Sequence, residues 1–191
     1  MKQAWPSIVD ECLKVLGSEL HYQAMVYHCL RQYAQVPVDQ LGMNVKMLIS
    51  NPASALFKKL DRKRHADYQG AFEPIPDVVI FSPEIDGDWR RRNREKTLKS
   101  MLMAIEVKAS ERQGGRLRYG ELSNDIEKLA AHREEVEHLG SDMLPVMMVI
   151  DTAPEETERT RNETIKRCVE LARERDVLFL YLSSERTIET W

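Results

Sequence analysis

The chain has 191 residues, of which 42% are hydrophobic and 31% are charged, with eight glycines and eight prolines. This composition excludes collagen-like, low-complexity and wholly disordered chains, because it supplies enough apolar surface for a buried core. The length suits one domain, and no linker or repeat divides it, so we treat residues 1–191 as a single domain.

Several features favour a cytoplasmic protein with no membrane partner. No apolar run approaches the roughly 18 residues that cross a bilayer. The N-terminus carries charged residues where a signal peptide has its apolar centre. Cys12, Cys29 and Cys168 are odd in number and widely spaced, which indicates reduced thiols and neither a disulfide framework nor a zinc site.

The net charge of −3 is divided unevenly along the chain. Residues 1–120 carry a net charge of +5, and residues 121–191 carry −8. Such asymmetry is compatible with a surface that binds a polyanion, although it does not by itself identify one.

The first half of the chain predicts helices followed by strands. Residues up to about 35 have a helical pattern, with a break at Gly17 and with Ser18 as a new N-cap. Residues 41–50 alternate between apolar and polar or small side chains, which predicts a strand. Asn51 and Pro52 then favour the start of a short helix.

The second half predicts a mixed sheet. Strands are expected at residues 77–81 and 101–108, a turn at 113–115, a helix at 122–138, and strands at 144–150 and 177–182 on either side of a helix that begins near Pro154. The first three strands can form an antiparallel meander, and the later strand–helix–strand segments imply parallel crossovers. We therefore predict an α/β fold, a mixed central sheet flanked by helices.

Two acidic residues lie at the ends of apolar strands. Asp77 opens the strand in Pro76-Asp77-Val78-Val79, and Glu106 lies near the end of the strand in Ala104-Ile105-Glu106-Val107-Lys108. Buried carboxylates are unfavourable unless they are paired or bind an ion. Glu106 and Lys108 are two residues apart and share one strand face, which Asp77 can join if the two strands pair. Carboxylates that converge in this way suit Mg²⁺ or Mn²⁺, and a nearby lysine can orient or deprotonate a water molecule.

Pro76-Asp77, followed by Glu106-Val107-Lys108, resembles the signature of the PD-(D/E)xK phosphodiesterase superfamily, the restriction-endonuclease-like nucleases. The resemblance covers about residues 15–151 and implies an αβββαβ core, with residues 152–191 as a C-terminal helix and strand appended to the sheet. It implies that Asp77, Glu106 and the Val107 carbonyl hold the metal and that Lys108 positions the attacking water. Glu19, on the helix before the sheet, would support the metal directly or through water.

Each of these residues also has a structural interpretation. Glu106 and Lys108 can form a solvent-facing ion pair on an edge strand, and Asp77 can be an ordinary strand-start residue after proline. Glu19 follows the predicted cap and can simply favour the helix dipole. Lys128 shares a helix face with Asp125 and His132 and is either a solvated position or a nucleic-acid contact.

A basic run lies between the Asp77 and Glu106 strands. We interpret Arg90, Arg91, Arg92, Arg94 and Lys96 as phosphate contacts on a mobile hairpin extension tethered to the site, with Trp89 available to stack or wedge. The alternative is a solvated loop or short helix. A second basic cluster, residues 58–65, supports either interpretation equally.

The sequence therefore predicts a Mg²⁺- or Mn²⁺-dependent nuclease. Of the possible activities, we expect an endonuclease that acts on DNA. A homodimer that cuts both strands is compatible with the resemblance. The alternative is a catalytically inactive nucleic-acid-binding or scaffolding subunit with the same fold.

Overall fold

The computed structural model describes residues 1–63, 70–110 and 115–191. Gln113 and Gly114 of the expected turn, and Arg64 and His65 of the second basic cluster, lie outside these ranges. The helices are α1 (Trp5–Cys12), α2 (Glu19–Gln32), α3 (Ala55–Arg62), α4 (Arg94–Lys99), α5 (Tyr119–His138) and α6 (Asn162–Glu174).

Within the described residues, the strands form a mixed six-stranded sheet and a small two-stranded one. The large sheet has the order β1-β4-β5-β6-β7-β8 and the small one pairs β2 with β3. The strands are β1 (Leu41–Met43), β2 (Ile49–Ser50), β3 (Ala71–Phe72), β4 (Val78–Phe81), β5 (Met101–Ala109), β6 (Leu144–Asp151), β7 (Leu178–Ser183) and β8 (Thr187–Glu189). β1, β4 and β5 are antiparallel neighbours, whereas β6 and β7 run parallel to β5. The predicted mixed α/β sheet and its antiparallel meander are confirmed.

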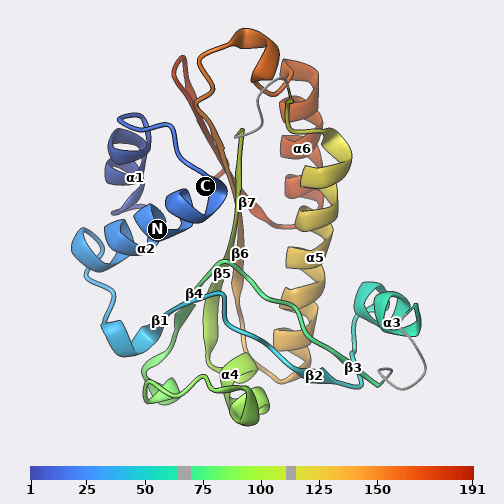
Figure 1. The fold of residues 1–191 in the computed structure, drawn as a ribbon. Helices are drawn as coiled ribbons and strands as arrows, with labels where there is room; N and C mark the ends of the chain where they lie inside the picture. The colour runs from blue at the N-terminus through green and yellow to red at the C-terminus, as the bar shows by residue number, and fades with distance from the viewer. Residues whose placement is uncertain (64–69, 111–114) are drawn as a thin grey trace.

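Helices cover both faces of the large sheet, with α1 and α2 on one side and α5 and α6 on the other (Figure 1). The alternation of side chains along β6 produces these two cores. Val146, Met148 and Ile150 are buried with residues of α1 and α2, while Met147 and Val149 are buried with residues of α5 and α6. A strand that is apolar on both faces is typical of a sheet covered on both sides.

The N-terminal helix break lies where the sequence predicts it. Ser18 caps α2, and its hydroxyl accepts a hydrogen bond from the His21 backbone N–H. Tyr22 then fixes the helix to the sheet, because its hydroxyl lies 2.9 Å from Thr152 Oγ1, just beyond β6. These contacts hold the first turn of α2, and therefore Glu19, against the end of the sheet.

The single strand expected at residues 41–50 is wrong, because the segment is divided between two sheets. β1 ends at Met43, Asn44 has a left-handed backbone conformation with φ of 49°, and β2 pairs with β3 instead. The short helix begins later than expected. Asn51 is also left-handed, and Ser54 caps α3 by accepting a hydrogen bond from Phe57 N–H. Asparagine tolerates this conformation better than most residues, so both asparagines mark turns.

The C-terminal part continues the main sheet. α6 begins at Asn162 and not near Pro154, since a short 3-10 turn at Glu156–Glu158 precedes it. β7 lies beside β6, and β8 adds an antiparallel edge strand that the sequence pattern did not predict. Trp5 of α1 donates a hydrogen bond to Glu189 of β8 over 2.7 Å, which links the two ends of the chain. In the described ranges, no helix has both the length and the apolar character needed to cross a bilayer.

The close packing around β1 gives a test of the fold. A Cβ atom added at Gly42 would lie 2.5 Å from Val45 Cγ2 and 3.3 Å from the Phe81 ring, whereas one added at Gly120 in α5 would meet nothing within 4 Å. We expect Gly42→Ala to lower the free energy of unfolding by about 1–3 kcal/mol, the usual effect of overpacking. Gly120→Ala is the matched control and should be neutral or raise it by up to about 1 kcal/mol. Urea unfolding measures both, and equal stability of the two variants would contradict this packing.

Candidate active site

The Asp77 side chain accepts a backbone hydrogen bond from β5 at the point where the ladder between β4 and β5 ends. In the antiparallel ladder Val78 pairs with Ile105, so Asp77 lies opposite Glu106, where β4 begins. The Val107 N–H therefore has no β4 carbonyl to bond, and it donates instead to Asp77 Oδ2 over 2.7 Å. Buried backbone donors are almost always satisfied. Asp77 is consequently buried and fixed beside the strand that carries Glu106 and Lys108.

Glu106 and Lys108 share one face of β5, as the sequence predicts. Ile105 and Val107 are buried against the α1–α2 side, so the residues between and after them project toward α5. Lys108 Nζ lies 3.3 Å from Glu106 Oε1, and both side chains are about one-fifth exposed. Because β5 lies between β4 and β6 in the sheet, the alternative of a solvent-facing pair on an edge strand is wrong.

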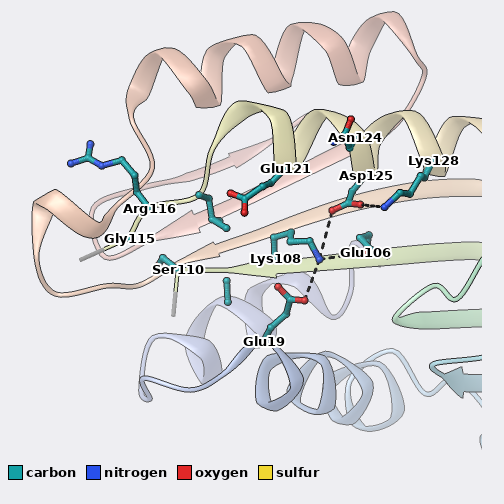
Figure 2. Close-up of a pocket in the computed structure, with 12 residues that line it drawn as sticks. Glu19, Glu106, Lys108, Ser110, Gly115, Arg116, Glu121, Asn124, Asp125 and Lys128 are labelled. Carbon is teal, nitrogen blue, oxygen red and sulfur yellow. Dashed lines mark hydrogen bonds and ion pairs between the residues drawn. The ribbon is translucent and has the colours of Figure 1, made fainter. Parts of the chain in front are cut away.

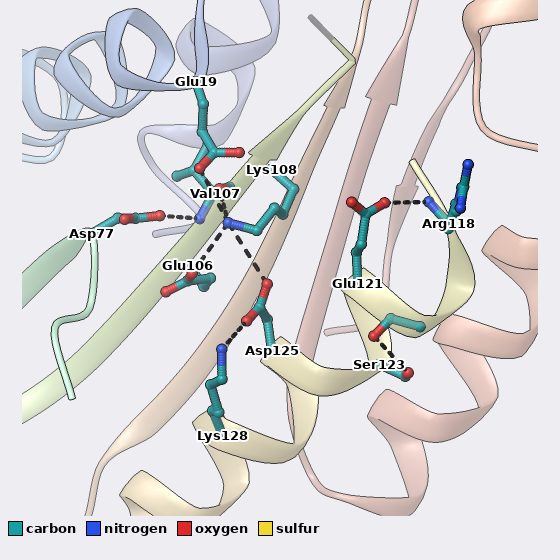
Figure 3. Close-up of polar contacts among 11 residues, drawn as sticks. Glu19, Asp77, Glu106, Val107, Lys108, Arg118, Glu121, Ser123, Asp125 and Lys128 are labelled. Atoms are coloured by element: carbon teal, nitrogen blue, oxygen red, sulfur yellow. Dashed lines mark hydrogen bonds and ion pairs between the residues drawn. The ribbon is translucent and has the colours of Figure 1, made fainter. Parts of the chain in front are cut away.

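Two helices bring further carboxylates to Lys108. Glu19, the first residue of α2, places Oε1 3.1 Å from Lys108 Nζ. Asp125 of α5 places Oδ2 3.6 Å from the same nitrogen, and its other oxygen lies 2.8 Å from Lys128 Nζ. Figure 3 shows Lys108 in the centre of this group. The ammonium group of Lys108 thus contacts carboxylates from α2, from the sheet and from α5.

Asp125 is the site residue that the sequence left without a role. Its side chain is only 9% exposed, although aspartate is usually found at the surface. The available signal was its spacing of three residues from Lys128 on the polar face of α5. That spacing could not reveal the contact with Lys108, because it depends on how α5 packs over β5.

Burial and mutual repulsion raise the pKa values of the two strand carboxylates. Desolvation raises the pKa of Asp77 to about 6, opposed by the Val107 N–H and by Lys108. Desolvation also raises the pKa of Glu106 to about 7, and the negative charge of Asp77 adds to this effect. For Lys108, burial alone would lower the pKa, but Glu106, Asp125 and Glu19 together raise it above its ordinary value. The lysine is therefore protonated at neutral pH.

The cluster opens into a cavity of about 460 Å³ between β5, α2 and the first turns of α5. Glu19, Glu106, Lys108, Asp125 and Lys128 line one part of it, and Figure 2 shows their side chains pointing toward one another. Arg116, Glu121 and Asn124 are among the residues that line the remainder. The cavity is thus lined by carboxylate, cationic and amide side chains.

The oxygen atoms at this site are of the type that binds a hard divalent cation. Mg²⁺ and Mn²⁺ prefer carboxylate and carbonyl oxygens, which Asp77, Glu106 and the Val107 backbone can supply. A cation would also favour the ionised forms of the two carboxylates, which burial and, after it, mutual repulsion disfavour. Among the described residues, however, no three ligand-type side chains already form a metal-binding group. The carboxylates of Glu19, Glu106 and Asp125 are instead gathered around the Lys108 ammonium.

The basic run lies at the opposite end of the β4–β5 hairpin from Asp77 and Glu106. It connects Phe81 to Met101, which pair at the far end of the ladder. The expected mobile hairpin extension is wrong, because residues 91–99 form a 3-10 turn followed by α4. Trp89 is also not available as a wedge, since its ring stacks on Phe81 with centroids 5.4 Å apart.

Most of the charges in this run have local partners. Arg90 pairs with Asp88 at 2.6 Å, Arg91 with Glu73 at 2.6 Å, and Lys96 with Asp86 at 3.0 Å. Arg94 donates a hydrogen bond to Ser50 Oγ, and Arg92 is exposed. Nucleic-acid binding by these residues stays a prediction, but they do not adjoin the Lys108 cluster. Of the predicted nucleic-acid contacts, Lys128 is the one that lies in the cavity.

Comparisons with protein-family models, curated proteins and solved structures found no match to this chain.

The raised carboxylate pKa values predict how stability depends on pH. Between about pH 4 and 7 the folded protein holds protons on Asp77 and Glu106 that the unfolded chain has released, so the contribution of these groups to stability falls as pH rises through this window. We expect Glu106→Gln, which mimics the protonated form, to raise the free energy of unfolding at pH 8 by at least about 1 kcal/mol. At pH 5 the difference should be small.

Urea unfolding at pH 5 and pH 8 without divalent cations measures this effect. Glu170→Gln, at an exposed position in the middle of α6, is the control and should behave like the wild type at both pH values. Destabilisation by Glu106→Gln at pH 8 would contradict the assigned electrostatics.

Proposed function

We propose that the protein is a Mg²⁺- or Mn²⁺-dependent nuclease that hydrolyses phosphodiester bonds in nucleic acid, with DNA as the first substrate to test. The observation that carries the proposal is the convergence of Asp77, Glu106 and Lys108 at the point where β4 begins beside β5. The order α2, β1, β4, β5, α5, β6 also matches the αβββαβ core implied by the resemblance to PD-(D/E)xK nucleases. Because β4 pairs with β5, Asp77 lies beside Glu106 and Lys108 although it is distant from them in the sequence.

The metal would be held by Asp77, Glu106 and the Val107 carbonyl, with Glu19 as a further ligand directly or through water. When bound, such an ion activates a water molecule and offsets negative charge on the phosphate. Asp77 is already oriented for this role, because Val107 N–H holds one of its oxygens. Glu106 and Asp77 would be fully ionised in the presence of the cation, since a nearby positive charge favours the charged form of a carboxylate.

Lys108 is a hydrogen-bond donor in this scheme and not a base. Its pKa is raised by the surrounding carboxylates, so at neutral pH it has no free lone pair with which to abstract a proton. Its three N–H groups can orient the attacking water and stabilise negative charge on the phosphate oxygens. Of the two roles that the sequence left open for this lysine, the charge distribution supports water positioning.

Lys128 and Arg116 supply positive charge at the edge of the cavity. The Lys128 side chain is 53% exposed and is held by Asp125, and Arg116 lines the same cavity from the segment before α5. Cationic side chains in these positions suit the phosphates on either side of the bond to be cut. Asp125 accordingly positions two cations, Lys108 and Lys128.

Cleavage assays on DNA with Mg²⁺ or Mn²⁺ test the proposal. We expect Lys108→Ala to lower kcat/KM by at least about 100-fold, the low end of the effect of removing one hydrogen-bond donor to the transition state, and Asp77→Asn to abolish metal-dependent cleavage. Lys166→Ala, at an exposed position on α6, is the matched control and should keep full activity.

Two results would count against the nuclease assignment. Cleavage that survives both Lys108→Ala and Asp77→Asn would exclude this site as its source. Salt-dependent DNA binding by the wild type without any metal-dependent cleavage would favour the alternative function, an inactive nucleic-acid-binding or scaffolding subunit.

A further inference from the structure

A second, smaller cavity adjoins the Lys108 cluster. It has a volume of about 230 Å³ and lies between α5 and the segment that leads from β3 into β4. Glu106, Asp125 and Lys128 line both this cavity and the larger one. A ligand group in the small cavity would therefore lie directly beside a phosphate held at Lys108 and Lys128.

The small cavity has both apolar and charged walls, and Glu73, Glu106, Asp125 and Lys128 are its charged residues. Phe72, Pro74, Ile75 and Pro76 line it from the segment before β4, and Leu129 lines it from α5. Pockets for drug-sized ligands occupy about 300–1,000 Å³, so this volume suits a group no larger than a small ring system. Apolar and aromatic walls favour the flat face of such a ring.

His132 lines the same cavity and contains a polar atom without a partner. The residue is 3% exposed, lines the cavity, and its Nε2 has no hydrogen-bond partner. Burial lowers the pKa of its imidazole to about 4, so the ring is neutral at pH 7. Most buried polar atoms have partners. This nitrogen has less than 1 Å² of accessible surface, so a ligand that presents a complementary group can reach it only if the ring or the cavity wall shifts.

We propose that the small cavity, here called the base pocket, receives the unpaired base of a nucleotide next to the phosphate that is cut. A nucleotide joins a flat, apolar-faced ring with a hydrogen-bonding edge to an anionic group. The base pocket offers the apolar residues and His132 of its lining for the first. For the second, Lys128 lines the pocket and Lys108 lines the adjoining cavity. This inference rests on the proposed function and specifies its substrate class, a single strand or a locally unpaired site.

A paired base in a regular duplex would not reach this pocket. Its edge is hydrogen-bonded to the opposite strand and its faces are stacked, so it must leave the helix to enter this pocket, which is unfavourable by a few kcal/mol. The base pocket therefore favours single strands, flaps and mismatched sites over intact duplex.

Fluorescence anisotropy in EDTA tests the base pocket without any catalysis. The probes are a short labelled thymidine strand, an abasic strand of the same length that keeps the phosphates, and the corresponding duplex. We expect the thymidine strand to bind about tenfold more tightly than the abasic strand, and more tightly than the duplex. Equal affinity for the thymidine and abasic strands would overturn the inference.

Two variants locate the effect. His132→Leu removes the unpartnered nitrogen, and Ile75→Ala shortens a wall residue that is 45% exposed and so tolerates substitution. Both should reduce the preference for the thymidine strand while leaving abasic binding unchanged. His138→Leu, at the exposed end of the same helix, is the control and should keep the wild-type preference. A preference that both test variants retain would place base recognition elsewhere and overturn the inference.

Failure of the proposed function gives a different result. Base-dependent binding that responds to His132→Leu, without cleavage in Mg²⁺ or Mn²⁺, would retain the base pocket and reject the nuclease. Metal-dependent cleavage by a protein that does not distinguish thymidine from abasic strands would retain the nuclease and reject the base pocket.

Discussion

The arrangement of the site depends on the balance between buried carboxylates and the Lys108 ammonium group. Glu19, Glu106 and Asp125 contact this lysine from α2, β5 and α5, and Asp77 is held beside it by the Val107 N–H. Four carboxylates at a part-buried sheet end repel one another, and Lys108 and Lys128 offset only part of their charge. Burial, together with the remaining repulsion, raises the pKa values of Asp77 and Glu106. A divalent cation would complete the charge balance, and this is the physical basis of the proposed metal dependence.

The fold produces this charge cluster by ending one strand early. β4 begins at Val78, so beyond Ile105 the adjacent edge of β5 has no backbone partner. The first turn of α2 lies beside this gap, and α5 covers it from the opposite face (Figure 1). Ser18 and Tyr22 hold the α2 turn in position through the helix cap and the contact with Thr152. This polar opening in an otherwise apolar sheet lowers the stability of the fold locally. Such a local loss of stability is typical of functional sites.

The sequence predicted the centre of the site because the relevant rules are local. Alternation along residues 101–108 places Glu106 and Lys108 on one face, and antiparallel pairing adds Asp77. The contact of Asp125 with Lys108 depends on the packing of α5, which no local pattern specifies. The division of residues 41–50 depends on two left-handed asparagines. The basic run was misplaced for a different reason: a hairpin connection lies at the end of the ladder where the first strand finishes, whereas Asp77 and Glu106 lie at the other end.

The most direct test of the central claim is a crystal structure of the wild-type protein grown with Mn²⁺, with anomalous scattering used to locate the ion. The charge balance described above predicts a manganese ion bound by Asp77, Glu106 and the Val107 carbonyl, with Lys108 beside it. Manganese bound elsewhere, or none at this position at saturating concentration while Lys108 retains its contacts with Glu19 and Glu106, would contradict the account.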